Sequence, residues 1–268
     1  MVDAPCVTID TATKFDQRHR DAVLVCGSHG GVYPGYLAAK AGLRALLAND
    51  AGIGLDRAGI GCLDYCEALG MAAATVAHDS ARIGDGADMR RRGRISHVNQ
   101  IAAGLGCAPG QSVEDALEAL VRAPAWQGDP PAYREGRHIV VAHPGKPRVI
   151  CMNSASMIEP EDAGQIVITG SHGAMLASMP ELVLRVDALA ALFNDAGIGI
   201  DDAGVTRLRA LDRRGIAAAT VDAMTARIGD GLSTYQDGVL SRVNEAALAL
   251  GARRGMRAQD FVAALTGS

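Results

Sequence analysis

The sequence predicts an α/β protein built from two similar lobes, each with a mainly parallel sheet flanked by helices. Short motifs recur at a nearly constant separation along the 268-residue chain. Apolar runs typical of buried strands alternate with segments of helical spacing, and Gly-rich polar motifs follow the apolar runs. Strand–helix alternation favours parallel sheets covered on both faces, and the recurrence favours two copies related by an approximate twofold axis.

The recurrence is strongest in three motifs that are shifted by 145 positions. They are NDAGIG (49–54 and 194–199), AAATV (72–76 and 217–221) and ARIGDG (81–86 and 226–231). A fourth motif, GSHG, occurs at 27–30 and 170–173. Because the shift holds across predicted strands, loops and helices, we interpret the chain as an internal duplication. Its parts are a first repeat at 6–121, a linker at 122–148 and a second repeat at 149–265.

Each repeat is predicted to begin with two strands, followed by a helix and a third strand. The first two strands are expected at 7–9 and 22–25 in one repeat, and at 149–151 and 166–168 in the other. Apolar residues spaced by three and four predict a helix over Tyr36–Leu46. A strand then runs into Asn49–Asp50. The linker holds a candidate edge strand over His138–Ala142.

The remainder of each repeat is predicted from helix caps and one more apolar run. Asp56, and Asp201 in the second repeat, suit the N-cap of a helix, and the AAATV motif suits a strand. Two helices are expected to close the repeat. Ser112 opens the last helix, with Asp115 three residues later in a capping-box pattern.

Composition and charge exclude several classes of protein. The net charge of -4 and the pI near 6.0 leave no basic surplus to neutralise phosphates, and 3% aromatic residues supply few stacking platforms. We therefore exclude nucleic-acid binding. No apolar stretch approaches the roughly 20 residues of a membrane helix. The N-terminus lacks the basic start and apolar run of a secretory signal, so we expect a cytoplasmic protein without membrane contact.

The polar motifs are predicted to gather at one edge of each sheet. GSHG, NDAG and the loop containing ARIGDG each follow a predicted strand, and in open α/β sheets ligands bind outside the carboxyl ends of the strands. The expected catalytic residues are His29, Asp50, His172 and Asp195. The expected substrate-binding residues are Ser28, Asn49, Ser80, Arg82, Asp85, Ser171, Asn194, Thr225, Arg227 and Asp230.

These residue types suit acid–base chemistry on a small anion. In each repeat the GSHG histidine is the expected general base, and the NDAG aspartate is its orienting partner. The ARIGDG arginine is expected to grip the anion with its guanidinium fork. The backbone amides of GSHG are expected to stabilise negative charge that develops during the reaction.

Each motif also has an alternative interpretation, in which its residues only stabilise the local structure. GSHG is also typical of a tight strand-to-helix turn, and NDAG of a turn held by its own side chains. Arg82 and Arg227 would brace their loops if they paired with Asp85 and Asp230. A divalent metal at the two motif histidines is a further alternative, although the chain has no standard metal-binding spacing. No cofactor is predicted.

The sequence thus predicts an enzyme that acts on a small anionic metabolite, a carboxylate or a cyclic amide. Hydrolysis is slightly favoured over elimination, as in a lyase, or isomerisation. A non-catalytic sensor that binds a nucleotide or metabolite is the alternative, and a protein whose repeats only assemble is a third. A homo-oligomer is compatible with each of these three functions. Cys26 is replaced by Thr169 and His78 by Ala223 in the second repeat, which suits a composite site with unlike halves or one active and one supporting site.

Overall fold

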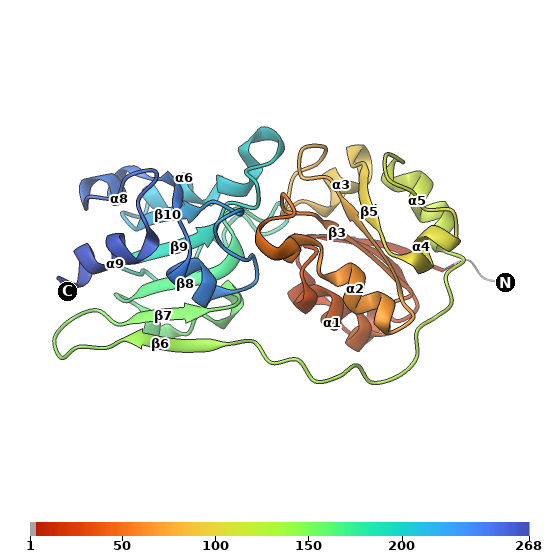
Figure 1. The fold of residues 1–268 in the computed structure, drawn as a ribbon, viewed down its shortest axis with the longest axis horizontal. Helices are drawn as coiled ribbons and strands as arrows, with labels where there is room; N and C mark the ends of the chain where they lie inside the picture. Colours follow the sequence, from red (N-terminus) through yellow and green to blue (C-terminus); the bar gives the residue numbers. More distant parts are fainter. Residues whose placement is uncertain (1–3, 268) are drawn as a thin grey trace.

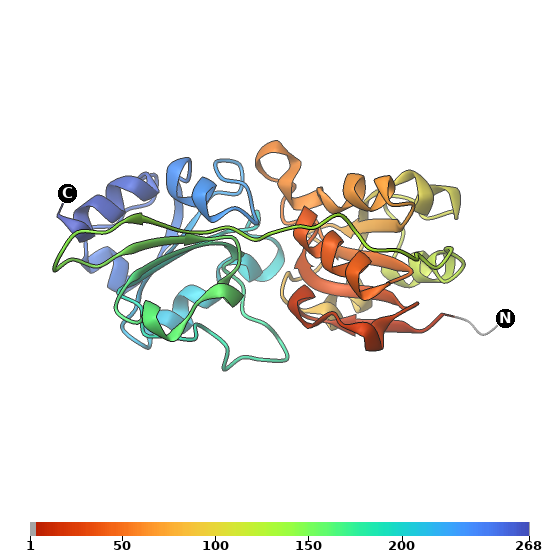
Figure 2. The same ribbon diagram turned by 90° about the horizontal axis from the view of Figure 1, so that it is seen from below.

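The structure, a computed structural model, describes residues 4–267, so residues 1–3 of the N-terminal segment discussed above and Ser268 lie outside the described residues. Two lobes lie side by side, and a long extended segment connects them along one side of the molecule (Figures 1 and 2). One lobe holds a five-stranded sheet and the other a six-stranded sheet. The predicted α/β class, with two mainly parallel sheets flanked by helices, is confirmed.

Buried apolar runs form the strands of the first lobe. The parallel strands are, in spatial order, β1 (Cys6–Ile9), β2 (Val23–His29), β3 (Ala45–Asn49) and β4 (Ala72–Val76). β5 (Ile95–Val98) lies antiparallel to β4 at the edge. Every residue of β3 and β4 is buried, as expected for strands covered on both faces. The prediction placed only helices after β4, so it missed β5.

The second lobe repeats this arrangement and adds one edge strand. Its parallel strands are β7 (Val149–Met152), β8 (Ile166–His172), β9 (Ala190–Asn194) and β10 (Ala217–Val221). The antiparallel strands are β11 (Leu240–Val243), which pairs with β10, and β6 (Arg137–Val141), which pairs with β7. The strand order and the directions of β7–β11 therefore match those of β1–β5.

Helices pack on both faces of each sheet and enclose two apolar layers per lobe. The first lobe has α1 (Val32–Ala41), α2 (Cys62–Ala68), α3 (Gly86–Arg92), α4 (Gln100–Gly104) and α5 (Val113–Leu120). The second has α6 (Arg207–Asp212), α7 (Gly231–Gln236), α8 (Glu245–Ala249) and α9 (Ala258–Thr266). The Ser112 side chain accepts the Asp115 amide at 3.1 Å, so the predicted N-cap of α5 is confirmed.

One helix of the first lobe has no counterpart in the second. α1 follows GSHG in the first lobe, whereas residues 173–188 of the second lobe contain no helix. We call residues 173–188 the covering segment. Pro180 stands in its middle, and a proline inside a helix removes a hydrogen bond and clashes with the preceding turn. The expectation that both repeats share this helix is therefore wrong.

Two predicted boundaries also need correction. The helix expected over Tyr36–Leu46 ends at Ala41, because Gly42 adopts a left-handed conformation with φ of 73° and the chain enters β3 soon afterwards. Asp56 and Asp201 are not helix N-caps. Both have positive φ values, 52° and 58°, inside the 3-10 turns that follow NDAG.

The lobes meet through reciprocal contacts between these turns. A Cβ atom added to Gly52 would lie 2.8 Å from the Cα of Gly197, and the converse distance is also 2.8 Å. The Leu55 amide donates to the carbonyl of Ala223 at 2.8 Å, while the Ile200 amide donates to the carbonyl of His78 at 2.9 Å. Backbone therefore packs directly on backbone, and the seam has no room for side chains at its closest point.

We predict that Gly52→Ala destabilises the protein more than Gly70→Ala. Both glycines have positive φ, 73° and 77°, so both variants carry the same backbone strain, about 1–2 kcal/mol. A Cβ on Gly70 meets nothing within 4 Å, whereas a Cβ on Gly52 strikes the other lobe and adds about 1–3 kcal/mol. Urea denaturation of both variants measures the free energies of unfolding. Equal losses would mean that the lobes do not pack at this seam.

Candidate functional site

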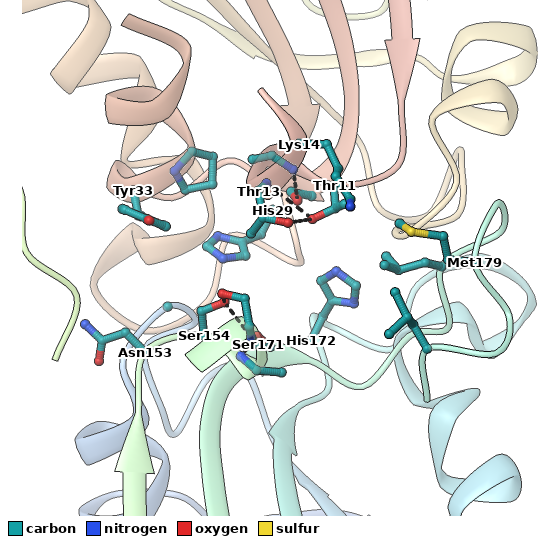
Figure 3. Close-up of a pocket in the computed structure, with 18 of the residues that line it drawn as sticks. Thr11, Thr13, Lys14, His29, Tyr33, Asn153, Ser154, Ser171, His172 and Met179 are labelled. Carbon is teal, nitrogen blue, oxygen red and sulfur yellow. Dashed lines mark hydrogen bonds between the residues drawn. The ribbon is translucent and has the colours of Figure 1, made fainter. Parts of the chain in front are cut away.

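A cavity of about 420 Å³ opens between the lobes and is lined by both of them (Figure 3). His29 and His172 approach it from opposite lobes, at the ends of β2 and β8. The first lobe further contributes Thr11, Ala12, Thr13, Lys14, Ser28, Tyr33, Pro34 and Leu37. The second lobe contributes residues 153–156, Ser171, Arg207, Gly229, and both apolar side chains and the exposed Arg185 of the covering segment. Glu135 comes from the connecting segment.

The local fold of GSHG turns each histidine toward the cavity. The register of β2 against β3 shifts between Cys26 and His29, and the register of β8 against β9 shifts between Ile168 and His172. Such irregularities re-aim the side chains that follow them. A Cβ on Gly27 would lie 2.8 Å from a carbonyl oxygen and a backbone nitrogen of neighbouring loops, so this close approach requires glycine.

Both imidazoles are neutral at neutral pH. Burial lowers the pKa of His29 to about 4. Burial, followed by the positive charge of Arg207, holds the pKa of His172 well below the ordinary value of 6.5. The Gly31 amide donates to Nδ1 of His29 at 3.1 Å, and the Ala174 amide donates to Nδ1 of His172 at 3.3 Å. An Nδ1 that accepts leaves the proton on Nε2, so each ring presents an N–H donor.

Arg207 is a buried cation without a counter-ion. Its side chain lies in the cavity wall with 5% of the residue exposed, and burial lowers its pKa to about 10. Nη2 donates to the carbonyl of Ala174 at 2.9 Å, and the guanidinium lies 4.8 Å from the ring centroid of Phe193. Nε is buried with no partner, and no carboxylate among the described residues forms an ion pair with Arg207. An uncompensated buried charge is costly, so it favours an anionic ligand.

The covering segment explains why this cation reaches the cavity. Arg207 occupies the position that Cys62 holds in the first lobe: the Cys62 amide donates to the carbonyl of Gly30, and the Arg207 amide to that of Gly173, each at 2.8 Å. In the first lobe α1 packs over Cys62, with Gly35 against it. The second lobe lacks that helix, so a long side chain fits there.

Hydroxyl groups complete the polar part of the wall. Ser28 and Ser171 accept the amides of Ala12 and Ala155, each at 2.9 Å, and thereby fix the loops after β1 and β7. Two pairs of hydrogen-bonded hydroxyl groups also face the cavity from those loops. The hydroxyl oxygens of Thr11 and Thr13 are 3.0 Å apart, and those of Ser154 and Ser156 are 2.7 Å apart. No described hydroxyl bonds to either imidazole, so the wall holds no Ser–His dyad.

The predicted aspartates do not reach the cavity. Asp50 lies in the seam, where its carboxylate accepts from Nδ1 of His78 at 2.9 Å, and this contact lowers the pKa of Asp50 despite its burial. Asp195 accepts the amides of Gly197 and Ala223 but has no histidine, and burial raises its pKa. Neither aspartate orients a GSHG histidine, because a backbone amide already occupies each Nδ1.

The predicted arginines bridge the lobes instead of facing the cavity. Nη2 of Arg82 lies 2.9 Å from the Asp201 carboxylate, and Nη2 of Arg227 lies 2.7 Å from Asp56. Arg92 also pairs with Asp201 at 2.8 Å. The bracing that the sequence left open thus occurs chiefly across the seam rather than within one loop. Exposed pairs of this kind contribute about 0–1 kcal/mol each.

The other predicted binding residues hold loops together. Asn49 and Asn194 accept the amides two residues later and donate across to the carbonyls of Ala81 and Ala226. Asp85 and Asp230 are the N-caps of α3 and α7, and Ser80 and Thr225 bond backbone groups of their own loops. Of the predicted set, the structure brings only Ser28, His29, Ser171 and His172 together in the cavity wall.

Several wall residues escaped the sequence prediction. The aligned hydroxyl pairs were visible as the TAT and SAS segments of the two repeats, and the exchange of Cys62 for Arg207 was visible in the alignment. Glu135 and Lys14 carried no recognisable signal. Glu135 lies in the connecting segment, which has no counterpart in the repeat.

Comparison with protein families, curated proteins and solved structures finds no match to this chain. Within residues 4–267, no three or more His, Cys, Asp or Glu side chains are grouped so that they would hold a metal ion. No helix in the same part of the chain has the length and apolar character needed to cross a membrane.

We predict that His78 stabilises the seam in a pH-dependent way. The Asp50 carboxylate raises the pKa of His78 and His78 lowers the pKa of Asp50. Because the pKa of His78 is higher in the folded than in the unfolded protein, protonation of His78 stabilises the folded state. This stabilisation is complete below the unfolded-state pKa of about 6.5, and it is lost as the pH rises through the folded-state pKa. Ionised Asp50 likewise stabilises the folded state. This stabilisation is complete above the unfolded-state pKa of about 3.9, and it is lost as the pH falls through the lowered folded-state pKa.

The test compares the wild type with His78→Ala, the residue found at the equivalent position Ala223. We expect the variant to lose about 1–2 kcal/mol of unfolding free energy near pH ~5.5 and less near pH ~8.5. Urea denaturation at several pH values measures the difference. A constant difference would show that the charge on His78 does not stabilise the seam.

Proposed function

We propose that the protein is an enzyme that carries out acid–base chemistry on a small anionic metabolite bound between its two lobes. The observation that carries the proposal is the pair of neutral histidines, His29 and His172, which enter one cavity from opposite lobes beside the uncompensated Arg207. A cavity with several hundred Å³ and a few converging polar groups is typical of small-molecule sites.

The anion is held, in this proposal, by Arg207 rather than by Arg82 or Arg227. A guanidinium fork suits a carboxylate because two N–H groups match its two oxygens. The Nε2–H groups of His29 and His172 add neutral donors. Binding of an anion also raises the pKa of a nearby imidazole, which brings each ring closer to the range in which it transfers protons near neutral pH.

The two rings can take unlike roles. In the Nε2–H form an imidazole stabilises negative charge that develops on a substrate oxygen. Exchange of the proton to Nδ1 frees Nε2 as a base and costs about one backbone hydrogen bond, ~0.5–1.5 kcal/mol. One histidine then accepts the proton while the other stabilises the charge. Elimination and isomerisation use this pair directly, and hydrolysis would require water as the nucleophile because no Ser–His dyad lines the cavity.

We further infer that the lobes arose by duplication and are related by an approximate twofold axis. Motifs shifted by a constant number of positions, matching strand orders and reciprocal seam contacts support this inference. The cavity then combines two equivalent histidines with an anion-binding group from one lobe only, which makes the composite site asymmetric.

The histidine roles are tested with a panel of small carboxylates and cyclic amides in D₂O, followed by proton NMR. This readout detects C–H exchange, elimination and hydrolysis without prior choice of reaction. We expect one of His29→Gln and His172→Gln to lower kcat by about 10²–10⁴, the contribution of a positioned base. The other variant should lose about tenfold or less, because glutamine still places an N–H donor near the position of Nε2.

His143→Gln is the matched control, because His143 is exposed in the loop after β6 and lies outside the cavity. Asparagine variants extend the test, since an asparagine side chain ends near Nδ1 and leaves no donor at Nε2. A donor role predicts that asparagine lowers kcat more than glutamine. Unchanged turnover in both glutamine variants would refute the acid–base proposal and favour a binding sensor.

We predict that Arg207→Met stabilises the ligand-free protein while it abolishes anion binding. Methionine keeps the contact with Phe193 and removes a buried charge, so the free energy of unfolding should rise by about 1–2 kcal/mol. Thermal protection by small carboxylates should disappear. Arg209→Met is the control, because Arg209 is exposed on the same helix. Loss of stability, or unchanged protection, would contradict the anchoring role of Arg207.

A further inference from the structure

The cavity has groups of opposite charge on the two sides of its histidine pair. Figure 3 shows Tyr33 and Asn153 on one side of His29 and His172, and Met179 of the covering segment on the other. Glu135 interacts with Tyr33, so it belongs to the first side.

Arg207 belongs to the second side. It bonds the carbonyl of Ala174, where the covering segment begins, and its charge acts on His172. A ligand that spans the histidine pair therefore meets a carboxylate at one end and a guanidinium at the other.

Glu135 is the carboxylate of the cavity wall that lacks a cation. Among the described residues that line the cavity it is the one acidic side chain, and it forms no ion pair with any described Lys, Arg or His. Its Oε1 is buried and accepts no hydrogen bond. Burial raises the pKa of Glu135, and a hydrogen bond with the Tyr33 side chain partly offsets this effect. A buried carboxylate oxygen without a donor is costly, so the site favours a ligand that brings an N–H group.

Aromatic rings adjoin this carboxylate. Tyr33, Tyr36 and Tyr133 form a cluster with ring centroids 5.3–6.0 Å apart, in a chain that has only 5 tyrosines. The faces of aromatic rings attract cations, and Lys40 already lies 5.8 Å from the ring centroid of Tyr36. Tyr33 is the member of the cluster that lines the cavity. A carboxylate beside tyrosine suits an ammonium group better than a neutral hydroxyl.

We propose that the ligand is an amino-carboxylic acid whose ammonium group is bound by Glu135 and Tyr33 and whose carboxylate is bound by Arg207. This inference rests on the proposed function, because it assigns the substrate class of the same cavity. The two ligand groups are separated by the histidine pair, so they belong to opposite ends of the molecule. A dicarboxylate would place like charges against each other at Glu135, and a simple carboxylate would leave Oε1 without a donor.

The test is isothermal titration of the full-length protein with matched probes. β-Alanine, γ-aminobutyrate, ε-aminocaproate and glycylglycine carry both charges at increasing separation. Butyrate and caproate lack the ammonium group, butylamine and hexylamine lack the carboxylate, and glutarate has a second carboxylate. We expect at least one amino-carboxylate to bind about tenfold or more tightly than its single-charge analogues, since each charge-assisted contact adds roughly that factor.

Variants locate the ammonium contact. Glu135→Gln should weaken the best amino-carboxylate about tenfold or more and change the binding of caproate or butyrate by less than about twofold. Glu118→Gln is the matched control, because Glu118 is exposed on α5 and remote from the cavity wall. Tyr33→Phe provides a second test of the ammonium contact if the Glu135 variant does not fold. It should weaken amino-carboxylates selectively, by a smaller factor.

The outcomes separate this inference from the proposed function. Amino-carboxylates that bind no better than the simple carboxylates, or that bind equally well to wild type and Glu135→Gln, overturn the inference. Turnover of an amino-carboxylate with full activity in Glu135→Gln would do the same, while it would support the acid–base enzyme. Selective, Glu135-dependent binding with no chemistry in any D₂O assay would support the inference and overturn the enzyme.

Discussion

The backbone-to-backbone contact of the two NDAG turns is the constraint on which the rest of the molecule depends. Because Gly52 and Gly197 leave no space for a Cβ, the carboxyl ends of both sheets are brought face to face. Every motif that follows a parallel strand must then either pack into the seam or border the space beside it. NDAG and ARIGDG pack into the seam. GSHG and the loops after β1 and β7 border the cavity, so the two histidines and the hydroxyls of those loops remain available to a ligand.

The sequence predicted the parallel strands of both sheets but missed the antiparallel strands β5 and β11. β4 and β10 are fully buried runs that coincide with the predicted AAATV strands, whereas the first residues of β3, Ala45 and Leu46, had been assigned to the preceding helix. β5 and β11 have four residues each and mixed burial, so no periodicity identified them. The covering segment was wrongly predicted to be helical, because the segments before and after it resemble those of the first lobe and the effect of Pro180 was overlooked. Similarity on both sides of a segment does not show that the segment itself has the same secondary structure in both lobes.

Prediction of the site failed for a different physical reason. Position at a strand end indicates which edge of the sheet a side chain occupies, and that inference held for both histidines. The partner of each polar group depends on the docking of the lobes, which brings Arg227 to Asp56, 171 positions away in sequence. Spacing within one repeat contains no information about such contacts. Hence the aspartates predicted to be catalytic and the arginines predicted to bind substrate lie in the seam. The buried cation of the cavity wall, Arg207, stands at a position where the first lobe has a cysteine.

The divergence of the two lobes follows one pattern. Where the first lobe has a helix and a cysteine, the second has an irregular segment and Arg207. Where the first lobe pairs its buried aspartate with His78, the second has no histidine, and Asp195 accepts only from neutral groups such as the amides of Gly197 and Ala223. Beside the cavity, only the second lobe has the buried arginine and the irregular segment, whereas GSHG occurs in both lobes. The GSHG histidine therefore lies at the same strand end in both lobes although its surroundings differ.

Charge balance in the cavity gives the strongest physical argument for a ligand. Nε of the buried Arg207 guanidinium and Oε1 of Glu135 both lack the partners that buried polar groups normally have. Arg207 and Glu135 do not satisfy each other, because the histidine pair lies between them. Each unmet interaction costs stability in the ligand-free protein, and a single molecule with a carboxylate and an ammonium group would satisfy both at once. The arrangement that is unfavourable when the cavity is empty therefore becomes complementary when such a ligand binds.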